Sequence, residues 1–357
     1  MRYVSGKVLT EEGFVNGHVG FEDGVVMEVS KGEAPGAEAK GVIVPTFIDA
    51  HTHLADLGVK VDLTLPLEDV VAPPNGLKHR YLTEAPAAEI RRSFEVLSRR
   101  MFRGGVSRFV DFRECGVHGS MLLRKVGKEG SKPYIMGRPS SLRYDREEVD
   151  ELLKHADGVG VSSITDWPYE ELEALAEHVV GKGRRFALHA SERVREDIDK
   201  VLDLGPSFVV HMTKATLSDM EACRDAKVPI VVCPRSNMFF GNVPPLAALV
   251  SSGASLALGT DNAMIALPDM LKEMEFAARV LRGQGVRDVT GVLEMATAGG
   301  RLILNEGHSI SIRPGTPCDF VVLRSPGGDP LTDLVLRSSE NDVRMVCVGS
   351  QSWRGWR

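Results

Sequence analysis

The sequence lacks any uninterrupted apolar run of the roughly 20 residues that a membrane-spanning helix requires. Cysteine is scarce as well, since only five cysteines are scattered along 357 residues and none forms a CxxC pair. A dispersed, odd set of thiols is typical of a reducing compartment rather than of a disulfide framework. The segment Met1–Thr10 also lacks the basic and then apolar order of a secretion signal. We therefore expect a soluble, cytoplasmic protein without a membrane partner.

The chain also has fewer basic than acidic residues. The chain has 43 Lys and Arg residues against 49 Asp and Glu residues, which gives a formal net charge of −6. A nucleic-acid partner requires a basic face, so we expect a small-molecule substrate, and a homo-oligomer remains compatible with this composition. Hydrophobic residues make up 43% and charged residues 26% of the chain. These values are ordinary for folded proteins and exclude disorder as the main state.

Eight short apolar runs recur along the middle of the chain and are separated by stretches with helical periodicity. The runs are Val42–Ile48, Val106–Phe112, Pro133–Met136, Gly158–Ile164, Phe186–His189, Phe208–His211, Ile230–Cys233 and Leu256–Gly259. Eight β–α alternations over about 260 residues predict an α/β fold of the (β/α)8 TIM-barrel type. The alternative, a doubly wound open sheet, would need a glycine-rich phosphate loop after its first strand, and the sequence has none there.

Both ends of the chain show a different pattern of short β-like segments. Val15–Phe21 and Val25–Val29 flank Asp23-Gly24, a dipeptide that is typical of a hairpin turn. Cys318–Leu323 and Val343–Val348 have the same character near the other end. Because chain termini often lie close together, we expect these segments to pair into one small β-domain.

This pairing predicts two domains. The small β-domain is expected to consist of residues 1–43 and 308–357, and the barrel of residues 44–307.

Two histidines end the first predicted barrel strand, in Asp49-Ala50-His51-Thr52-His53. Residues two apart in a strand point to the same side, so His51 and His53 can converge on one metal ion. The active site of a TIM barrel lies at the C-terminal ends of its strands, which is where this pair falls. By itself, an HxH pair fits a surface location equally well.

Three further apolar strands lead into a metal-binding or acid–base residue at the same end, namely His189, His211 and Asp261. His189 and His211 are 22 residues apart, the length of one βα unit, and Asp261 follows 50 residues later, after two units. Imidazole nitrogens together with a carboxylate suit Zn²⁺, and also Fe²⁺ or Mn²⁺. The four strand ends therefore predict a divalent metal site.

Glu192 lies three residues after His189. A carboxylic acid just beyond a metal ligand can hold a proton and pass it to water or to a leaving group. An acidic residue in the first turn of a helix is also favoured by the helix dipole. The residue alone leaves both roles open.

Together, these motifs resemble the amidohydrolase superfamily, and within it the branch of cytosine deaminase, guanine deaminase and chlorohydrolases. The matching segments are Val44–His53, His189–Glu192, His211, Cys233–Asn237 and Gly259–Asn262. The resemblance covers nearly the whole chain. The terminal segments, with Pro314–Leu323, resemble the small β-sandwich of that superfamily, so a sandwich is the expected form of the β-domain.

The resemblance implies one divalent metal ion, Zn²⁺ in the first place and otherwise Fe²⁺ or Mn²⁺, bound by His51, His53, His189 and Asp261. It also implies that His211 contacts the hydrolytic water and that Asp261 takes a proton from this water. Glu192 would be the proton shuttle of the deaminases. The implied activity is that of a metal-dependent hydrolase acting on C–N bonds other than peptide bonds.

Three departures limit what the resemblance carries over. Binuclear members have a carboxylated lysine at the end of strand four, where this chain reads Val161–Asp166 without a lysine, so one metal ion is expected. Thr46 stands where a glycine is usual in the first motif. The segment after His53 is short and carries Pro73-Pro74, so the substrate contacts usual there cannot be transferred.

The reaction depends on the substrate pocket more than on the metal ligands. We expect an aminohydrolase, a deaminase that releases ammonia from a heterocyclic and anionic small molecule. A cyclic-amide hydrolase or a chlorohydrolase on the same scaffold remains an alternative, and so does a non-catalytic protein that kept the fold.

Four basic residues follow predicted strands at the end where the metal site is expected: Arg113, Arg138, Lys214 and Arg235. Guanidinium groups bind carboxylate or phosphate in a forked geometry, so a basic ring there would hold an anionic group of the substrate. The alternative is that these residues pair with local acids such as Glu114, Asp111 and Asp166.

Overall fold

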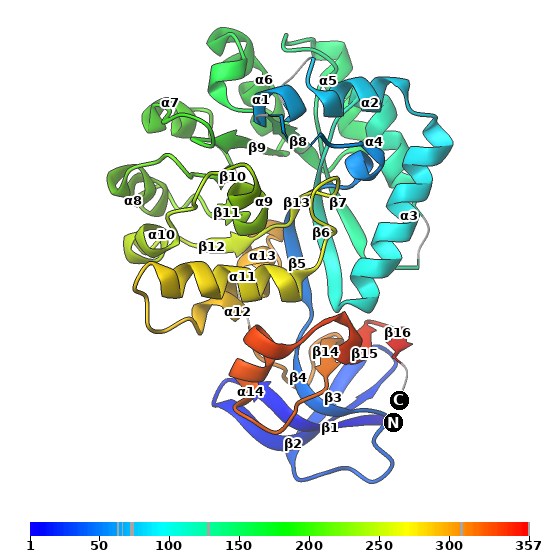
Figure 1. The fold of residues 1–357 in the computed structure, drawn as a ribbon. Coiled ribbons are helices and arrows are strands. Elements are labelled where there is room, and N and C mark those ends of the chain that lie inside the picture. Colours follow the sequence, from blue (N-terminus) through cyan, green and yellow to red (C-terminus); the bar gives the residue numbers. More distant parts are fainter. Residues whose placement is uncertain (63, 66, 72–74, 127–128, 308–309, 356–357) are drawn as a thin grey trace.

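The computed structural model describes residues 1–357 except 63, 66, 72–74, 127–128, 308–309 and 356–357. The prolines at 73–74 and the expected domain start at 308 therefore lie outside the described residues. Two sheets organise the described part of the chain, one of nine strands and one of seven. Figure 1 shows the larger sheet enclosed by helices, with the smaller sheet and both chain termini below it.

The nine-stranded sheet is parallel throughout and closes into a barrel. Its order is β12-β11-β10-β9-β8-β7-β6-β5-β13. The strands are β5 (Phe47–His53), β6 (Val106–Arg113), β7 (Lys132–Gly137), β8 (Gly158–Val161), β9 (Arg185–Ala190), β10 (Phe208–His211), β11 (Ile230–Val232), β12 (Leu256–Leu258) and β13 (Asp261–Asn262). β12 and β13 are successive parts of one extended segment, which pairs with β11 on one side and with β5 on the other. This segment joins the two edges of the sheet, and the predicted TIM barrel is confirmed.

Helices surround the barrel. They are α1 (Leu67–Val71), α2 (Leu77–Glu84), α3 (Ala87–Arg103), α4 (Gly116–Arg124), α5 (Arg146–His155), α6 (Tyr169–Gly181), α7 (Ile198–Asp203), α8 (Leu217–Asp225), α9 (Pro234–Phe239), α10 (Leu246–Ser252), α11 (Met270–Gly283), α12 (Gly291–Ala296) and α13 (Ala298–Leu304), with 3₁₀ turns η1 (Leu54–Gly58) and η2 (Ile164–Asp166). Among the described residues, no helix combines the length and the apolar character that crossing a membrane requires.

Side-chain hydrogen bonds define where several of these helices start. Asp145 accepts the backbone N–H groups of Glu147 and Glu148 at the start of α5. Thr216 and Asp219 form a reciprocal capping box at the start of α8. Such caps satisfy backbone donors that a helix leaves unpaired at its first turn, so the turns before α5 and α8 end at defined residues.

The barrel interior is a packed core rather than a channel. Inward-facing side chains such as Ile48, Val110, Met136 and Phe208 are buried in one apolar cluster. A second, larger cluster fills the layer between strands and helices, where Phe94 and Leu97 of α3 are buried. Because apolar side chains fill the interior, polar residues can meet only at the strand ends.

The first predicted barrel strand, Val42–Ile48, is divided between the two sheets, which corrects the expectation. Its first part belongs to β4 (Lys40–Pro45) of the small sheet, and its second part to β5 of the barrel. Thr46 lies at the change of sheet, where its hydroxyl is 2.7 Å from Ser107 Oγ and its carbonyl accepts from Arg301 at 3.0 Å. Both parts are buried and apolar, so hydrophobicity alone does not reveal the break.

The terminal segments form one seven-stranded sheet in the order β16-β15-β14-β4-β1-β2-β3. Besides β4 it contains β1 (Arg2–Thr10), β2 (Gly13–Glu22), β3 (Val25–Lys31), β14 (Asp319–Leu323), β15 (Val343–Val348) and β16 (Gln351–Arg354). The connection between β14 and β15 holds α14 (Pro330–Thr332), the π-turn η3 (Asp333–Arg337) and the 3₁₀ turn η4 (Glu340–Asp342). The strands enclose a core that includes Val4, Val19, Phe320 and Met345, so the two chain ends share one hydrophobic core.

The predicted hairpin at Asp23-Gly24 is present between β2 and β3. Both residues have a positive φ, 48° for Asp23 and 80° for Gly24, as the tight turn requires.

Candidate active site

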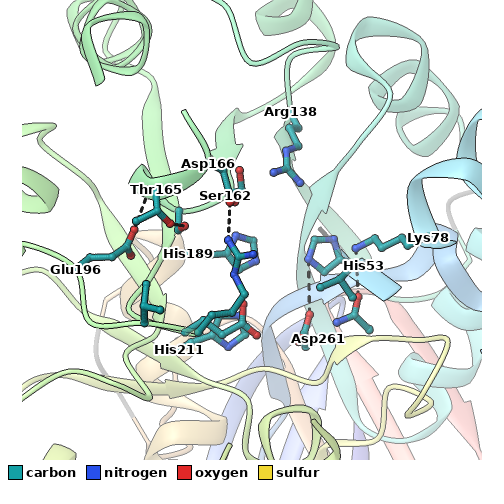
Figure 2. Close-up of a pocket in the computed structure, with 16 residues that line it drawn as sticks. His53, Lys78, Arg138, Ser162, Thr165, Asp166, His189, Glu196, His211 and Asp261 are labelled. Carbon is teal, nitrogen blue, oxygen red and sulfur yellow. Dashed lines mark hydrogen bonds and ion pairs between the residues drawn. The ribbon is translucent and has the colours of Figure 1, made fainter. Parts of the chain in front are cut away.

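The C-terminal ends of three strand segments bring four ligand-type side chains together: His51 and His53 from β5, His189 from β9 and Asp261 from β13. The Nε2 atoms of His51 and His189 are 3.2 Å apart. Asp261 Oδ1 lies 3.5 Å from His51 Nε2 and 3.6 Å from His53 Nε2. Figure 2 shows His53, His189 and Asp261 facing one another at the base of a cavity. The structure thus brings together the four predicted ligands.

Hydrogen bonds on the far side of two rings orient the imidazoles. His189 Nδ1 is 2.8 Å from the carbonyl oxygen of Val161, and His53 Nδ1 is 3.0 Å from that of Phe112. A carbonyl oxygen only accepts, so each Nδ1 carries the hydrogen and each Nε2 directs a lone pair toward the centre. Metal-bound histidines are held in this way in proteins.

The donor set fits a divalent metal ion. His51 is fully buried, and this burial lowers the pKa of His51 to about 3, so its imidazole is neutral and able to act as a ligand. Its Nε2 atom faces His189 Nε2 at 3.2 Å, so the two nitrogens can converge on one ion. Three imidazole nitrogens and one carboxylate oxygen are a ligand set that first-row divalent ions accept.

The backbone at these strand ends departs from ordinary strand geometry. His211 and Asp261 both have positive φ, 81° and 63°. A non-glycine residue in this region costs about 1–3 kcal/mol and persists only where its surroundings hold it. Gly259 precedes Asp261, and a Cβ atom on Gly259 would lie only 2.7 Å from His51 Cβ. The missing side chain at Gly259 lets the last strand approach β5 closely, which places Asp261 beside His51.

Glu192 and His211 complete the polar group at the cavity base. His211 Nε2 is 3.5 Å from Glu192 Oε1, while its Nδ1 lies 3.2 Å from the amide nitrogen of Asn237. The amide donates, so His211 Nδ1 accepts and its hydrogen is on Nε2, toward Glu192. Ligand atoms of Glu192, His211 and Asp261 lie within 4.8 Å of one another. Burial raises the pKa of Glu192 above its ordinary value, which favours a carboxyl group that carries a proton.

A cavity opens above this base. Its walls come from the ends of β7, β8 and β9 and from the segment after β5, and they are mostly polar. The lining residues are His53, Val71, Lys78, Arg138, Ser162, Ser163, Thr165, Asp166, His189, Glu192, Arg193, Val194, Glu196, His211, Asp261 and Asn262. The predicted ligands and acid–base residues thus face one space that can hold a small molecule.

Comparison with known proteins assigns this arrangement to a family. The model of the amidohydrolase family matches residues 42–352. The chain belongs to the amidohydrolase family. A protein of Archaeoglobus fulgidus, provisionally named an aminohydrolase, is 34% identical over 98% of this chain and 97% of its own length. The 5'-deoxyadenosine deaminase of Methanococcoides burtonii is 25% identical over 93% of this chain and 86% of its own length.

A solved structure shares the fold of this amidohydrolase. An adenosine deaminase from Xanthomonas campestris with bound zinc superposes with a TM-score of 0.80. The match covers 99% of this chain and 92% of that one, at 18% sequence identity. At this identity the likeness supports the barrel with its appended β-domain and nothing more specific.

The predicted basic ring of the amidohydrolase does not form, because three of its four members lie outside the cavity lining. Arg113 has an exposed fraction of only 1% and is held in ion pairs, 2.6 Å from Glu114 Oε2 and 3.4 Å from Asp111 Oδ1. Its guanidinium neutralises carboxylates inside the protein. The structure thus places Arg113 among buried acids and not in the cavity lining.

Lys214 and Arg235 also lie outside the cavity lining, for different reasons. Lys214 is exposed and is not among the residues that line the cavity. Arg235 is held by the buried carboxylate of Glu273, which accepts from the Arg235 backbone N–H at 2.9 Å and lies 3.5 Å from its guanidinium. The sequence predicted the strand end at which each residue lies. It could not predict that both side chains lie outside the cavity lining.

Arg138 is the member of the predicted ring that does line the cavity. Its exposed fraction is 8%, and its Nη2 atom is buried without a hydrogen-bond partner among the described residues. Figure 2 shows its guanidinium extending from the upper wall toward the histidines. A buried donor without a partner is costly, so Arg138 is a candidate for contact with an anionic or strongly accepting ligand.

Sequence reasoning missed Lys78, which comes from α2 and lines the cavity with an exposed fraction of 3%. Its Nζ atom lies 2.6 Å from Glu114 Oε1 and 3.2 Å from Asn262 Oδ1. Asn262 could have been suspected, because it follows Asp261 in a motif segment, but Lys78 lies in a stretch without periodicity. Only the fold brings Lys78 to the site.

Proposed function

We propose that this amidohydrolase is an aminohydrolase that releases ammonia from a heterocyclic small molecule. The observation that carries the proposal is the position of Glu192, a partly buried carboxyl group that lies beside His211 and shares the cavity base with Asp261 and the histidine nitrogens. Relatives named as deaminases of 5'-deoxyadenosine and of 5-methylthioadenosine and S-adenosylhomocysteine support the reaction class. We propose that the substrate of this chain also contains a heterocyclic ring.

His51, His53, His189 and Asp261 are proposed to bind one divalent ion, with Zn²⁺ preferred for this ligand set. Such an ion supplies Lewis acidity that makes water a stronger nucleophile near neutral pH. A single ion is favoured by the end of β8, where Ser162 and Ser163 follow the strand. The nearby Asp166 carboxylate is engaged by Arg193 at 2.5 Å, so it is not free to bridge a second ion.

The side chains then divide the proton transfers between them. Glu192 would donate a proton to the ring nitrogen of the substrate, regain one that Asp261 takes from the attacking water, and pass that proton to the leaving amine. This requires a carboxyl group that is protonated before attack. His211 carries its hydrogen on Nε2, on the side of Glu192, and would donate it to the oxygen that is added to the attacked carbon. Asp261 accepts from Ser236 Oγ at 2.5 Å through Oδ2, which fixes the orientation of Oδ1 for water and metal.

The test of the proposed function is an ammonia-release screen. Metal-loaded protein is incubated with purines, pterins, pyrimidines and their nucleosides, together with cyclic amides and chlorinated heterocycles, and ammonia, ring opening and chloride are measured. Ammonia release from a heterocyclic amine is the expected result, absent in a His51→Ala preparation purified in parallel. Ring opening or chloride release without ammonia would contradict the deaminase proposal and favour another hydrolase on the same scaffold.

The Arg138 side chain leads to a prediction about the charge of the substrate. Arg138→Met is expected to raise KM for an anionic substrate by about 10- to 150-fold, since a hydrogen bond to a charged group contributes about 1.5–3 kcal/mol. KM for a neutral analogue should change much less. Steady-state kinetics on both compounds measure the difference.

Lys214→Met is the matched control for this prediction, because Lys214 is exposed and outside the cavity lining. It removes the same charge and should leave KM for both compounds unchanged. Equal changes in KM for the charged and the neutral compound in Arg138→Met would show that Arg138 does not bind the charged group of the substrate.

A further inference from the structure

Glu114 occupies a buried position directly behind one of the proposed metal ligands. It follows the last residue of β6 and has an exposed fraction of 2%. Its Oε1 atom lies 2.8 Å from His53 Nδ1 and 2.6 Å from Lys78 Nζ, and its Oε2 atom lies 2.6 Å from an Arg113 nitrogen. Two cations and an imidazole therefore converge on this one carboxylate.

Lys78 reaches from this carboxylate to the opposite side of the metal ligands. Besides Glu114, its Nζ atom donates to Asn262 Oδ1 at 3.2 Å and lies 3.7 Å from Asp56 Oδ2. Asn262 is adjacent to Asp261 in β13 and pairs with His53 in the β5–β13 ladder. Figure 2 shows Lys78 extending toward His53 and the segment beside Asp261. One ammonium group thus connects α2, the end of β6 and the last barrel strand.

We propose that Lys78 and Glu114 are positioning residues that act as a pair on the metal ligands. Together with the Phe112 carbonyl oxygen, Glu114 holds the His53 ring so that Nε2 points at the metal position. Lys78 holds Glu114 and Asn262 in a fixed relation, so that His53 and Asp261 stay at ligand distance from each other. A carboxylate behind a ligating histidine also increases the basicity of the ring. The inference rests on the metal-binding part of the proposed function and not on the reaction that follows.

A purely structural role is the alternative, in which the group is a buried ion cluster that only stabilises the barrel. The two roles differ in what a substitution changes. A positioning pair affects the affinity and the geometry of the metal site in protein that is fully folded. A structural cluster lowers the melting temperature and leaves the metal site of the folded molecules unchanged.

The test uses metal-free full-length protein in competition with a chromophoric chelator for Zn²⁺. Glu114→Gln and Lys78→Met are each expected to weaken Zn²⁺ binding by about 10- to 100-fold, as substitutions behind metal ligands typically do. The double variant should weaken binding by less than the product of the two single effects, because residues that act as a unit are not additive. Circular dichroism confirms that each variant is folded.

A second measurement reports geometry directly. Wild-type protein loaded with Co²⁺ gives a visible absorption spectrum that depends on ligand arrangement, and Glu114→Gln is expected to change its band positions. Arg301→Met is the matched control, since Arg301 is another buried cation, with an exposed fraction of 7%, that pairs with Asp319 away from the site. It should lower the melting temperature and leave both Zn²⁺ affinity and the Co²⁺ spectrum unchanged.

The outcomes separate this inference from the proposed function. If wild-type protein binds no divalent ion, the metal site itself is wrong. If wild-type protein binds Zn²⁺ and both single variants bind it equally well with an unchanged Co²⁺ spectrum, the positioning role is overturned while the metal site stands. Should Glu114→Gln fail to fold, Lys78→Met decides by the same criteria, because its side chain borders the cavity rather than the apolar core.

Discussion

Glu192→Gln is expected to lower the turnover number by about 10²- to 10⁴-fold, the usual cost of removing a general acid–base group. Glutamine keeps the size and shape of the side chain but cannot donate a carboxyl proton. The carboxyl group of Glu192 is partly buried and lies 3.5 Å from His211 Nε2, at the base of the cavity. Turnover number and KM are measured at saturating metal.

Metal content and melting temperature should stay at wild-type values in Glu192→Gln, because Glu192 is outside the proposed ligand set. Glu173→Gln provides the charge control, since Glu173 is exposed on α6 and its substitution should leave turnover unchanged. Near-normal turnover in Glu192→Gln would show that the residue only favours the local backbone, as an acid at the start of a helix would, and would weaken the deaminase proposal.

The residues at the cavity base could be predicted from the sequence because barrel geometry is regular. Short apolar runs in the sequence indicate where each strand ends, and the C-terminal ends of all strands lie at one face of the barrel. His189 and His211 were therefore expected side by side from their spacing alone, and their strands are indeed adjacent in the sheet. The hairpin at Asp23-Gly24 could also be predicted from the sequence, since its conformation is determined by two neighbouring residues.

The direction of side chains beyond the strand ends could not be predicted in the same way. Arg113 ends β6 and Arg138 follows β7, yet Arg113 is neutralised by Glu114 and Arg138 borders the cavity. The difference depends on which acids the fold brings near, and Lys78, a competitor for the Glu114 carboxylate, comes from a distant segment. Position relative to a strand gives the end of the barrel at which a residue lies, but not its partners.

The change of sheet at Thr46 shows a second limit. A continuous apolar run predicts burial, and both β4 and β5 are buried, so the pattern contains no sign that the chain passes from one sheet to another. The break depends on contacts of Thr46 with Ser107 and with Arg301, which come from other parts of the chain. Long-range hydrogen bonds of this kind become visible only in the folded structure.

His51→Ala is expected to remove metal and activity together. His51 Nε2 lies 3.2 Å from His189 Nε2 and 3.5 Å from Asp261 Oδ1, so it is central among the donor atoms, and alanine offers no replacement. Elemental analysis of wild-type protein purified without chelator should give close to one equivalent of divalent metal per chain. The variant should give far less than one equivalent and no measurable turnover.

Removal of the metal should also lower the stability of the wild-type protein. A ligand present at about 1,000 times its Kd stabilises the folded state by about 4.1 kcal/mol, so a chelator is expected to lower the melting temperature of wild-type protein but not that of His51→Ala. His178→Ala is the matched histidine control, because His178 is 3.1 Å from Asp150 and 3.1 Å from Tyr144 and lies outside the cavity lining. It should retain one equivalent of metal. Two equivalents in wild-type protein would contradict the single-ion site, and an unaltered metal content in His51→Ala would show that the four donors do not form it.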